Sequence, residues 1–454
     1  MKTNRLVGWS SAGAFSFGLL LLLPFIDNST TTVISSHSSF HEAHQSPSGS
    51  YRTDPSNNHT SVDLPPQPDG NRPFTTNTDS IGEPKPIPPY IERALDWLAS
   101  AQFENGGWGA GTHANQGVRD PHAVSIDPAT TAFSGMALAR AGNTLTEGPY
   151  RSNLKRALDY LLAVVEQSPA DSPALTDLNG TQPQVKLGRF IDVSMVSQFL
   201  TRMLPETESD AKYHARVKNA LDKCVHKIQL AQNADGSISE GGWAGVLQSA
   251  MANNALEGAA DAGAKVDKDA LKRSQDYQQA NVSADGSVRT EAAAGVSLYS
   301  IASAQRAAAP IVRDARQRVE RARKEGKISE EAELDATTLQ SIGYSEDEAR
   351  RAAETVRSYE KATEMLGSDD VLSGFGNNGG EEFLSYMMTS EALASAGGAD
   401  WDNWYSRMNQ RLEHVQNQNG SWSGHHCITS PVFSTAAVIM TITADRDAYR
   451  FAQK

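Results

Sequence analysis

One pattern recurs between residues 93 and 422 and limits the folds that this chain can adopt. It reads Arg-Ala-x-x-Trp-Leu-x-x-x-Gln-x-x-x-Gly-x-Trp from Arg93 to Trp108, and the copy from Arg407 to Trp422 keeps five of these residue types at the same offsets. Partial copies lie between them, with Lys223, Gln232, Gly236, Arg273, Tyr277 and Gly286. Repeats with a period of a few tens of residues indicate units that bury one another.

A segment rich in alanine, glycine and serine follows each copy. The helices expected there span residues 128–141, 191–203, 244–260, 290–304, 382–396 and 431–443. Each copy and the helix after it would form a helical hairpin, and six hairpins can close into a ring that leaves no end exposed. The sequence therefore predicts an all-α fold over residues 89–444, with the small-residue helices inside.

The spacing of the pattern resembles the QW repeat of squalene and oxidosqualene cyclases, and the paired helices are similar to protein prenyltransferase β subunits. The resemblance implies an α/α toroid of six inner and six outer helices. It also implies an enzyme that acts on an apolar or isoprenoid-like ligand at the ring mouth. The sequence lacks the Asp-x-Asp-Asp acid motif of the cyclases, so the squalene-cyclase reaction is not expected.

One interval between repeats is longer than the others. The distance from Gly286 to Gly376 is 90 residues, and the surplus, about residues 305–365, is dense in charge. Arg316, Glu320 and Lys324 succeed one another at i,i+4, which supports a solvated helix. We expect a charged helical insertion that either only protrudes or docks a protein partner. Deletion of residues 308–362 is expected to leave the ring folded.

The first 88 residues differ in composition from the repeats. Lys2 and Arg5 precede an apolar stretch at residues 6–26, which predicts a signal peptide or an N-terminal membrane anchor over residues 1–27. Residues 28–88 are rich in Ser, Thr, Asn, His and Pro, as is typical of a disordered tether. We therefore expect an exported protein, either membrane-anchored through this segment or periplasmic or extracellular. Residues 445–454 would form a C-terminal tail.

The charge balance and cysteine count exclude some functions. A net charge of −13 argues against nucleic acid as a partner, because binding to phosphates depends on clustered Lys and Arg. Two cysteines are too few for a disulfide framework or a four-thiolate zinc site.

The candidate site lies where two inner helices are expected to begin. His425, His426 and Cys427 precede the last inner helix, and Glu381 and Glu382 begin the one before it. Histidine can act as a general acid or base, and His and Cys are zinc ligands. The proposed catalytic residues are His122, His425, His426 and Glu382. A zinc cofactor would be held by His426 and Cys427. A structural loop is the alternative.

A seam between the first and last hairpins suggests that these groups meet. His122 and His425 each stand five residues before an N-cap that is followed by proline, at Asp127 and Ser430. We expect His122, His425 or His426, and Cys427 to gather at one mouth of the ring, with a glutamate in reach. The alternative is that the equal offsets reflect only the ancestry of the repeats.

Aromatic and acidic residues near the turns are the proposed ligand-binding groups: Trp243, Phe375, Asp127 and Glu381. Aromatic faces can stabilise a cation or stack on a ligand. Three functions follow from this sequence. The first is an enzyme for an apolar or isoprenoid-like ligand. The others are a non-catalytic binding or scaffold protein, and a carbohydrate-active enzyme that uses paired carboxylates. An apolar tunnel would favour the isoprenoid enzyme, and a filled centre would favour the binding or scaffold protein. An acidic cleft lined by aromatic residues would favour the carbohydrate-active enzyme.

Overall fold

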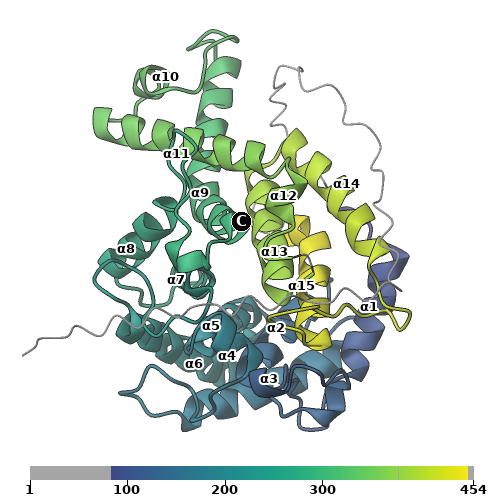
Figure 1. Ribbon diagram of the computed structural model, residues 1–454. Helices are drawn as coiled ribbons and strands as arrows, with labels where there is room; N and C mark the ends of the chain where they lie inside the picture. The colour runs from purple at the N-terminus through teal and green to yellow at the C-terminus, as the bar shows by residue number, and fades with distance from the viewer. Residues whose placement is uncertain (1–82, 377, 448–454) are drawn as a thin grey trace, which may run out of the picture. The chain divides into compact units, whose positions relative to one another are not determined.

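The computed structural model describes residues 83–376 and 378–447, within one compact unit. This part of the chain contains fifteen α-helices, and its β-structure is limited to isolated bridges (Figure 1). None of the described helices is long and apolar enough to cross a bilayer. The predicted signal or anchor at residues 1–27 and most of the tether lie outside the described residues.

Six helices form an inner ring. Each packs on the next one along the chain, and the last packs on the first, so the ring is closed (Figure 1). Every residue of the first and the last is buried, which explains why these helices lack a polar face. The inner helices are α2 (Pro128–Arg140), α5 (Ile191–Met203), α7 (Gly245–Asp261), α9 (Ser297–Lys324), α13 (Gly380–Ala396) and α15 (Pro431–Ile442).

Six amphipathic helices surround this ring. Each packs on the inner helix that precedes it, and α1, which has no predecessor, packs on α15. Their buried stripes have helical spacing, such as Tyr90, Ala94 and Leu98 in α1. The outer helices are α1 (Pro89–Ser100), α3 (Arg151–Gln167), α6 (Ala211–Ala231), α8 (Lys268–Gln279), α11 (Glu346–Met365) and α14 (Ala399–His414). The predicted α/α toroid of six hairpins is confirmed.

The repeated residues make the same contacts in the first and last copies. Gln102 Nε2 donates to the carbonyl oxygen of Gly106 over 2.9 Å, and Trp108 Nε1 donates to that of Leu98 over 2.8 Å. The equivalent pairs in the last copy are Gln416–Gly420 and Trp422–Leu412, each at 2.8 Å. The glutamine and the tryptophan thus attach the turn to the end of the outer helix.

The same glutamines also join neighbouring hairpins. Gln232 Oε1 accepts a hydrogen bond from Arg273 of the next hairpin over 2.9 Å. Gln416 Oε1 accepts one from Arg93 over 2.8 Å, so the last hairpin is bound to the first by the contact that joins internal neighbours. The repeated glycine lies at the same junction. A Cβ on Gly236 would stand 2.0 Å from the carbonyl oxygen of Arg273, so only glycine fits this close approach.

The charged insertion is partly integral to the ring. Helix α9 continues beyond the ring and pairs with α11, and the short helix α10 (Ala336–Ser341) lies near their distal ends (Figure 1). However, α11 is also the fifth outer helix, and its Tyr359 hydroxyl donates to the carbonyl oxygen of Ala392 in α13. The expectation that residues 308–362 contribute little to the core is wrong, because a stripe of small residues on α11 is buried: Ala349, Ala352, Ala353, Val356 and Ala362.

Two further short helices precede inner helices. They are α4 (Gln182–Lys186) before α5, and α12 (Asp369–Leu372) before α13. A capping box at Thr181 begins α4, with the Thr181 and Gln184 side chains bonded reciprocally to the backbone. These helices lie beside the starts of the inner helices and supply residues to the ring mouth.

Candidate functional site

Buried carboxyl groups occupy the starts of three inner helices. Asp127 is the N-cap of α2, Asp192 lies in the first turn of α5, and Glu381 and Glu382 lie in the first turn of α13. The inner helices run in the same direction, so these groups share one mouth of the ring. Helix N-termini favour negative charge, which makes this mouth a suitable place for carboxylates.

Glu382 is held by hydrogen bonds although its side chain is fully buried. Its Oε1 accepts from the Tyr299 hydroxyl over 2.5 Å and from the backbone N–H of Phe375 over 2.9 Å. Its Oε2 lies 3.9 Å from His426 Nε2. Burial and the adjacent glutamates raise the pKa of Tyr299, so its hydroxyl remains a donor to Glu382. The arrangement fixes one carboxyl oxygen and leaves the other facing the histidine.

Glu381 has different surroundings from its neighbour. Its Oε2 accepts a hydrogen bond from the backbone N–H of Ile428 over 3.1 Å, and the side chain is fully buried. Burial, followed by the proximity of Glu382, raises the pKa of Glu381 to about 8. At neutral pH Glu381 is therefore a carboxylic acid that carries a proton. Such a group can donate that proton to a bound molecule.

Cys427 adjoins Glu381 but lacks the properties of a reactive thiol. Burial and the Glu381 carboxyl raise its pKa to about 12, so the thiol stays protonated near neutrality. In the described ranges, no group of three or more His, Cys, Asp or Glu side chains is arranged to hold a metal ion. The proposed zinc pair of His426 and Cys427 therefore has no third protein ligand in this part of the chain.

Aromatic side chains cover the carboxyl groups. Phe375 contacts Trp243 and His426 edge-to-face, with ring centroids 4.9 and 5.5 Å apart, and Trp243 contacts Tyr299 at 6.4 Å. Phe375 is the outermost of them, with 56% of its surface exposed. Backbone also lies directly on the acid, because a Cβ on Gly379 would stand 2.3 Å from Glu382 Oε2. The predicted residues Trp243 and Phe375 thus belong to one cluster with the glutamates.

A groove of about 810 Å³ adjoins this cluster. It lies between the turn around Pro121 and the last repeat turn, and Trp97 and Phe383 also line it. Asn378 and His425 line the groove, and the residues next to them, Gly379 and His426, contact the acid cluster. Amide and hydroxyl side chains dominate one wall: Asn378, Asn417, Gln418, Asn419, Ser421 and Ser423.

The three histidines of the predicted seam cluster have different neighbours. His426 faces Glu382, whereas His425 is exposed and lines the groove. His122 instead lies near the end of α1, where its Nε2 is 3.2 Å from the carbonyl oxygen of Ser100 and its ring contacts Phe103. Within the described residues, no hydrogen bond or ring contact joins His122 to the other two. His122 lies in a short 3-10 turn, and the Asp120 carboxylate that caps this turn accepts a hydrogen bond from the His122 N–H.

Asp127 serves the fold at the position where a ligand contact was predicted. Its two oxygens accept hydrogen bonds from the Thr130 N–H and hydroxyl and from the Ala110 N–H. Burial raises its pKa, and these bonds oppose that rise. Because both oxygens are already bonded, Asp127 caps α2 and anchors the first turn.

Sequence reasoning missed two polar residues of this mouth. Tyr299 lies two residues after the observed start of α9, and the signal that could have found it is its place in a small-residue inner helix. Asp192 is almost fully buried, and burial and Asp127 raise its pKa to about 8. Its position in the first turn of an inner helix, equivalent to that of Glu381, was the available signal.

No protein-family model and no curated protein sequence matches this chain. Among solved structures, an inactive variant of an α-1,6-mannanase from a Salegentibacter species, in complex with α-1,6-mannotriose, is similar with a TM-score of 0.47 and 9% identity, over 79% of this chain and 98% of that chain. The type II terpene cyclase MstE from Scytonema is similar with a TM-score of 0.39 and 14% identity, over 78% of this chain and 96% of that chain. A variant of that cyclase in complex with merosterolic acid A has a TM-score of 0.32 and 13% identity, over 79% of this chain and 96% of that chain. At these values the similarities carry no argument about activity.

Proposed function

We propose that the ring mouth is the active site of an acid–base enzyme whose substrate is rich in hydroxyl groups, as a carbohydrate is. The observation that carries this proposal is the pair Glu381 and Glu382, two adjacent buried carboxyl groups in different environments. Two neighbouring titratable groups in different surroundings are typical of sites where one acts as the acid and the other as the base.

In this proposal each residue of the pair has its own role. Glu381, protonated at neutral pH, is the proton donor. Glu382, oriented by Tyr299 and the Phe375 N–H, is the base or the charge that stabilises a cationic transition state. His426 lies beside Glu382 and can exchange protons between the pair and the groove.

The polar groove supports a hydroxylated substrate over an isoprenoid-like one. Its amide and hydroxyl side chains can donate to and accept from sugar hydroxyls, and Trp97 adds an aromatic surface. The centre of the ring is filled by side chains, with the Phe133 and Phe433 rings stacked 4.7 Å apart, which argues against an isoprenoid-like ligand there and also favours the non-catalytic binding or scaffold protein. Neither of the two described cavities is an apolar tunnel.

Catalysis requires the aromatic cover to move, since neither glutamate is exposed. Phe375 stands between Gly374 and Gly376, both of which have positive φ angles and tolerate large backbone changes. Displacement of Phe375 would expose Glu382 and His426 beneath it. The complete burial of both acids also favours a second candidate, a binding protein without catalysis.

The test is turnover of soluble oligosaccharides by the full chain, measured as reducing ends released. Glu381→Gln is expected to lower the rate at least about 1,000-fold while substrate affinity changes less than about threefold, because the acid acts only in the transition state. The control is Glu104→Gln, which alters an exposed residue of the repeat turn after α1 and should keep full activity. Unchanged turnover in Glu381→Gln would contradict the acid–base role. Oligosaccharide binding by the unaltered chain without turnover would support the second candidate.

Export is part of the proposal. It is supported by the charged and apolar residues of the first 27 positions and by the Ser- and Pro-rich tether. Fractionation of cells that express the full chain, with N-terminal sequencing of the product, would distinguish an anchor from a cleaved signal. Recovery of the intact chain in the cytoplasm would contradict both. A protein partner for the α9–α11 extension stays a prediction.

A further inference from the structure

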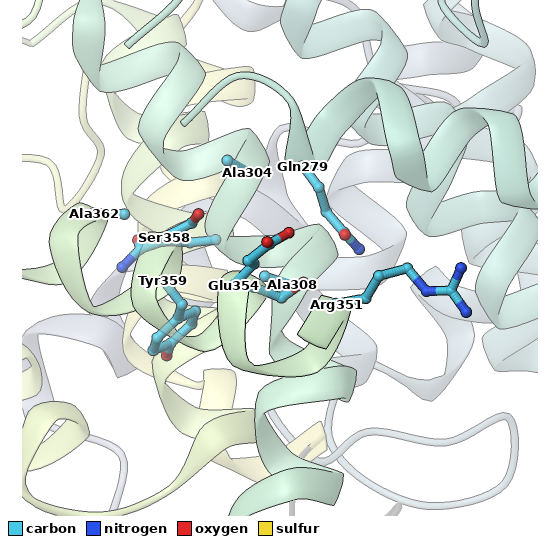
Figure 2. Close-up of a pocket in the computed structure, with 10 residues that line it drawn as sticks. Gln279, Ala304, Ala308, Arg351, Glu354, Ser358, Tyr359 and Ala362 are labelled. Atoms are coloured by element: carbon cyan, nitrogen blue, oxygen red, sulfur yellow. The ribbon is translucent and has the colours of Figure 1, made fainter. Parts of the chain in front are cut away.

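A second cavity opens on the outside of the ring, where α8 and α11 diverge over α9. It has a volume of about 190 Å³ (Figure 2). Its walls combine small apolar residues, Ala304 and Ala308 of α9 and Ala362 of α11, with polar side chains from all three helices. The site is independent of the acid pair, and nothing in the proposed function uses it.

One polar group among the residues that line this crevice, the amide of Gln305, is fully buried. Its Nε2 donates to Thr363 Oγ1 over 2.9 Å, and that hydroxyl donates its own proton to the carbonyl oxygen of Tyr359. The hydroxyl can therefore only accept from Gln305, which fixes the orientation of the amide. Gln305 Oε1 is left as a buried acceptor without a hydrogen-bond partner among the described residues.

The rim of the crevice carries one carboxylate and one guanidinium. Glu354 of α11 lines it, together with the Gln279 amide and the Ser358 hydroxyl. Arg351 also lines the crevice, but its guanidinium extends away from Glu354 (Figure 2). A ligand that fits these groups has an N–H donor for Gln305, a positive charge for Glu354, and a short aliphatic part for the alanines.

We propose that this crevice binds a short alkylammonium ion. The ammonium group donates to Gln305 Oε1 in the field of the Glu354 carboxylate, and its methylene groups pack on Ala304, Ala308 and Ala362. Buried polar atoms in native proteins are almost always paired, so an acceptor fixed in a cavity indicates a donor that comes from outside the chain.

The test is titration of the full chain with n-butylammonium chloride, followed by nuclear magnetic resonance. We expect saturable shifts, at least fivefold weaker binding in Glu354→Gln, and binding in Arg351→Gln that is unchanged or tighter. Both changes are on exposed residues of one helix, so they form a matched pair. Gln305→Met, if it melts cooperatively, should abolish the shifts. If it does not fold, the Glu354 and Arg351 variants decide.

Two outcomes would overturn the proposal. The first is the absence of saturable shifts with n-butylammonium. The second is equal binding of 1-butanol, which has the same aliphatic chain without the charge and would show that the crevice recognises only apolar groups.

Discussion

The two adjacent glutamates at the start of α13 show how the surroundings of a residue set its chemistry. Glu382 is oriented by two donors, whereas Glu381 has a pKa raised to about 8 from its usual 4.5. Between these pH values the unfolded chain releases a proton that the folded chain retains. Ionisation of Glu381 therefore favours unfolding increasingly as pH rises toward 8, and its effect is absent at pH 4.

Glu381→Gln is expected to stabilise the fold as pH rises, in addition to abolishing activity. The amide removes the penalty of burying an ionisable group, which is on the order of 4 kcal/mol at pH 8 and near zero at pH 4. Urea unfolding of the variant and the unaltered chain at these two pH values measures the difference. A gain of the same size at both would show that burial, rather than ionisation, accounts for it.

The site residues could be predicted only where residue type and helix start coincide. Glu381, Glu382, His426 and Cys427 were found because they lie at the starts of adjacent inner helices, and the structure brings them together. Tyr299 belongs to the same cluster but depends on the register of α9, which begins seven residues later than residue 290. His122 lies in a local 3-10 turn, and its meeting with the other histidines stays a prediction.

The repeat turns act at the level of the element, because each attaches an outer helix to its neighbour. Gly236 has a φ of +92° and lies against the backbone of Arg273. Gly263 has a φ of +79°, but nothing lies within 4 Å of where its Cβ would be. These two glycines therefore separate the cost of the backbone conformation from the cost of the close contact between hairpins.

Gly263→Ala should lower the free energy of unfolding by about 1–2 kcal/mol, the cost of a left-handed conformation for a residue with a Cβ. Gly236→Ala should lower it by at least about 2 kcal/mol more, because the added carbon would overlap the Arg273 carbonyl and force the junction apart. Equal losses in urea unfolding would show that the close approach adds no cost.

We expect the extension formed by α9, α10 and α11 to have a dispensable end and an essential base. Deletion of residues 308–362 should abolish cooperative melting, because it removes most of the fifth outer helix and its bond to α13. Deletion of residues 326–343, joined by a short glycine linker, removes α10 alone and should keep a cooperative transition. Thermal melts followed by circular dichroism compare the two. Cooperative melting of the larger deletion would restore the sequence-based expectation.

The helices of the fold were predictable where the repeat continues and less so where it lapses. The span 191–203 agrees with α5, and the other inner helices except α9 begin within two residues of their predicted starts. Helix α11 was taken for part of an insertion because its surface is highly charged and its buried stripe consists mainly of alanine. Alanine stripes carry little hydrophobic signal, so periodicity alone did not identify this helix as part of the ring.

At the scale of the whole molecule, Asp447 joins two inner helices at the mouth opposite the acids. Asp447 pairs with Arg140 over 2.6 Å and also with Arg202, and both arginines lie at the C-terminal ends of inner helices. Burial alone would raise the pKa of Asp447, but the two arginines lower it to about 2. Asp447 was assigned to a tail that begins at residue 445, but it forms ion pairs with two helices of the ring.

Asp447→Asn is expected to destabilise the fold by about 3 kcal/mol at pH 7, because it leaves buried arginine charge less compensated. The contribution of Asp447 is present above its unfolded pKa of about 4 and is lost as pH falls through about 2. The difference between the variant and the unaltered chain in denaturant unfolding should therefore shrink with acidification. A difference that is constant between pH 7 and pH 2 would contradict the ion-pair explanation.

The packing of α1 on α15 also affects how the chain is made. In chain order α1 precedes the other ring helices and α15 follows them, so the inner helix on which α1 packs is the last to be synthesised. The five later outer helices meet their inner helices as soon as they are synthesised. The nascent chain is therefore a growing arc with one uncovered helix at its leading end. Its final closure is a contact across more than 300 residues, as in the bond from Arg93 to Gln416.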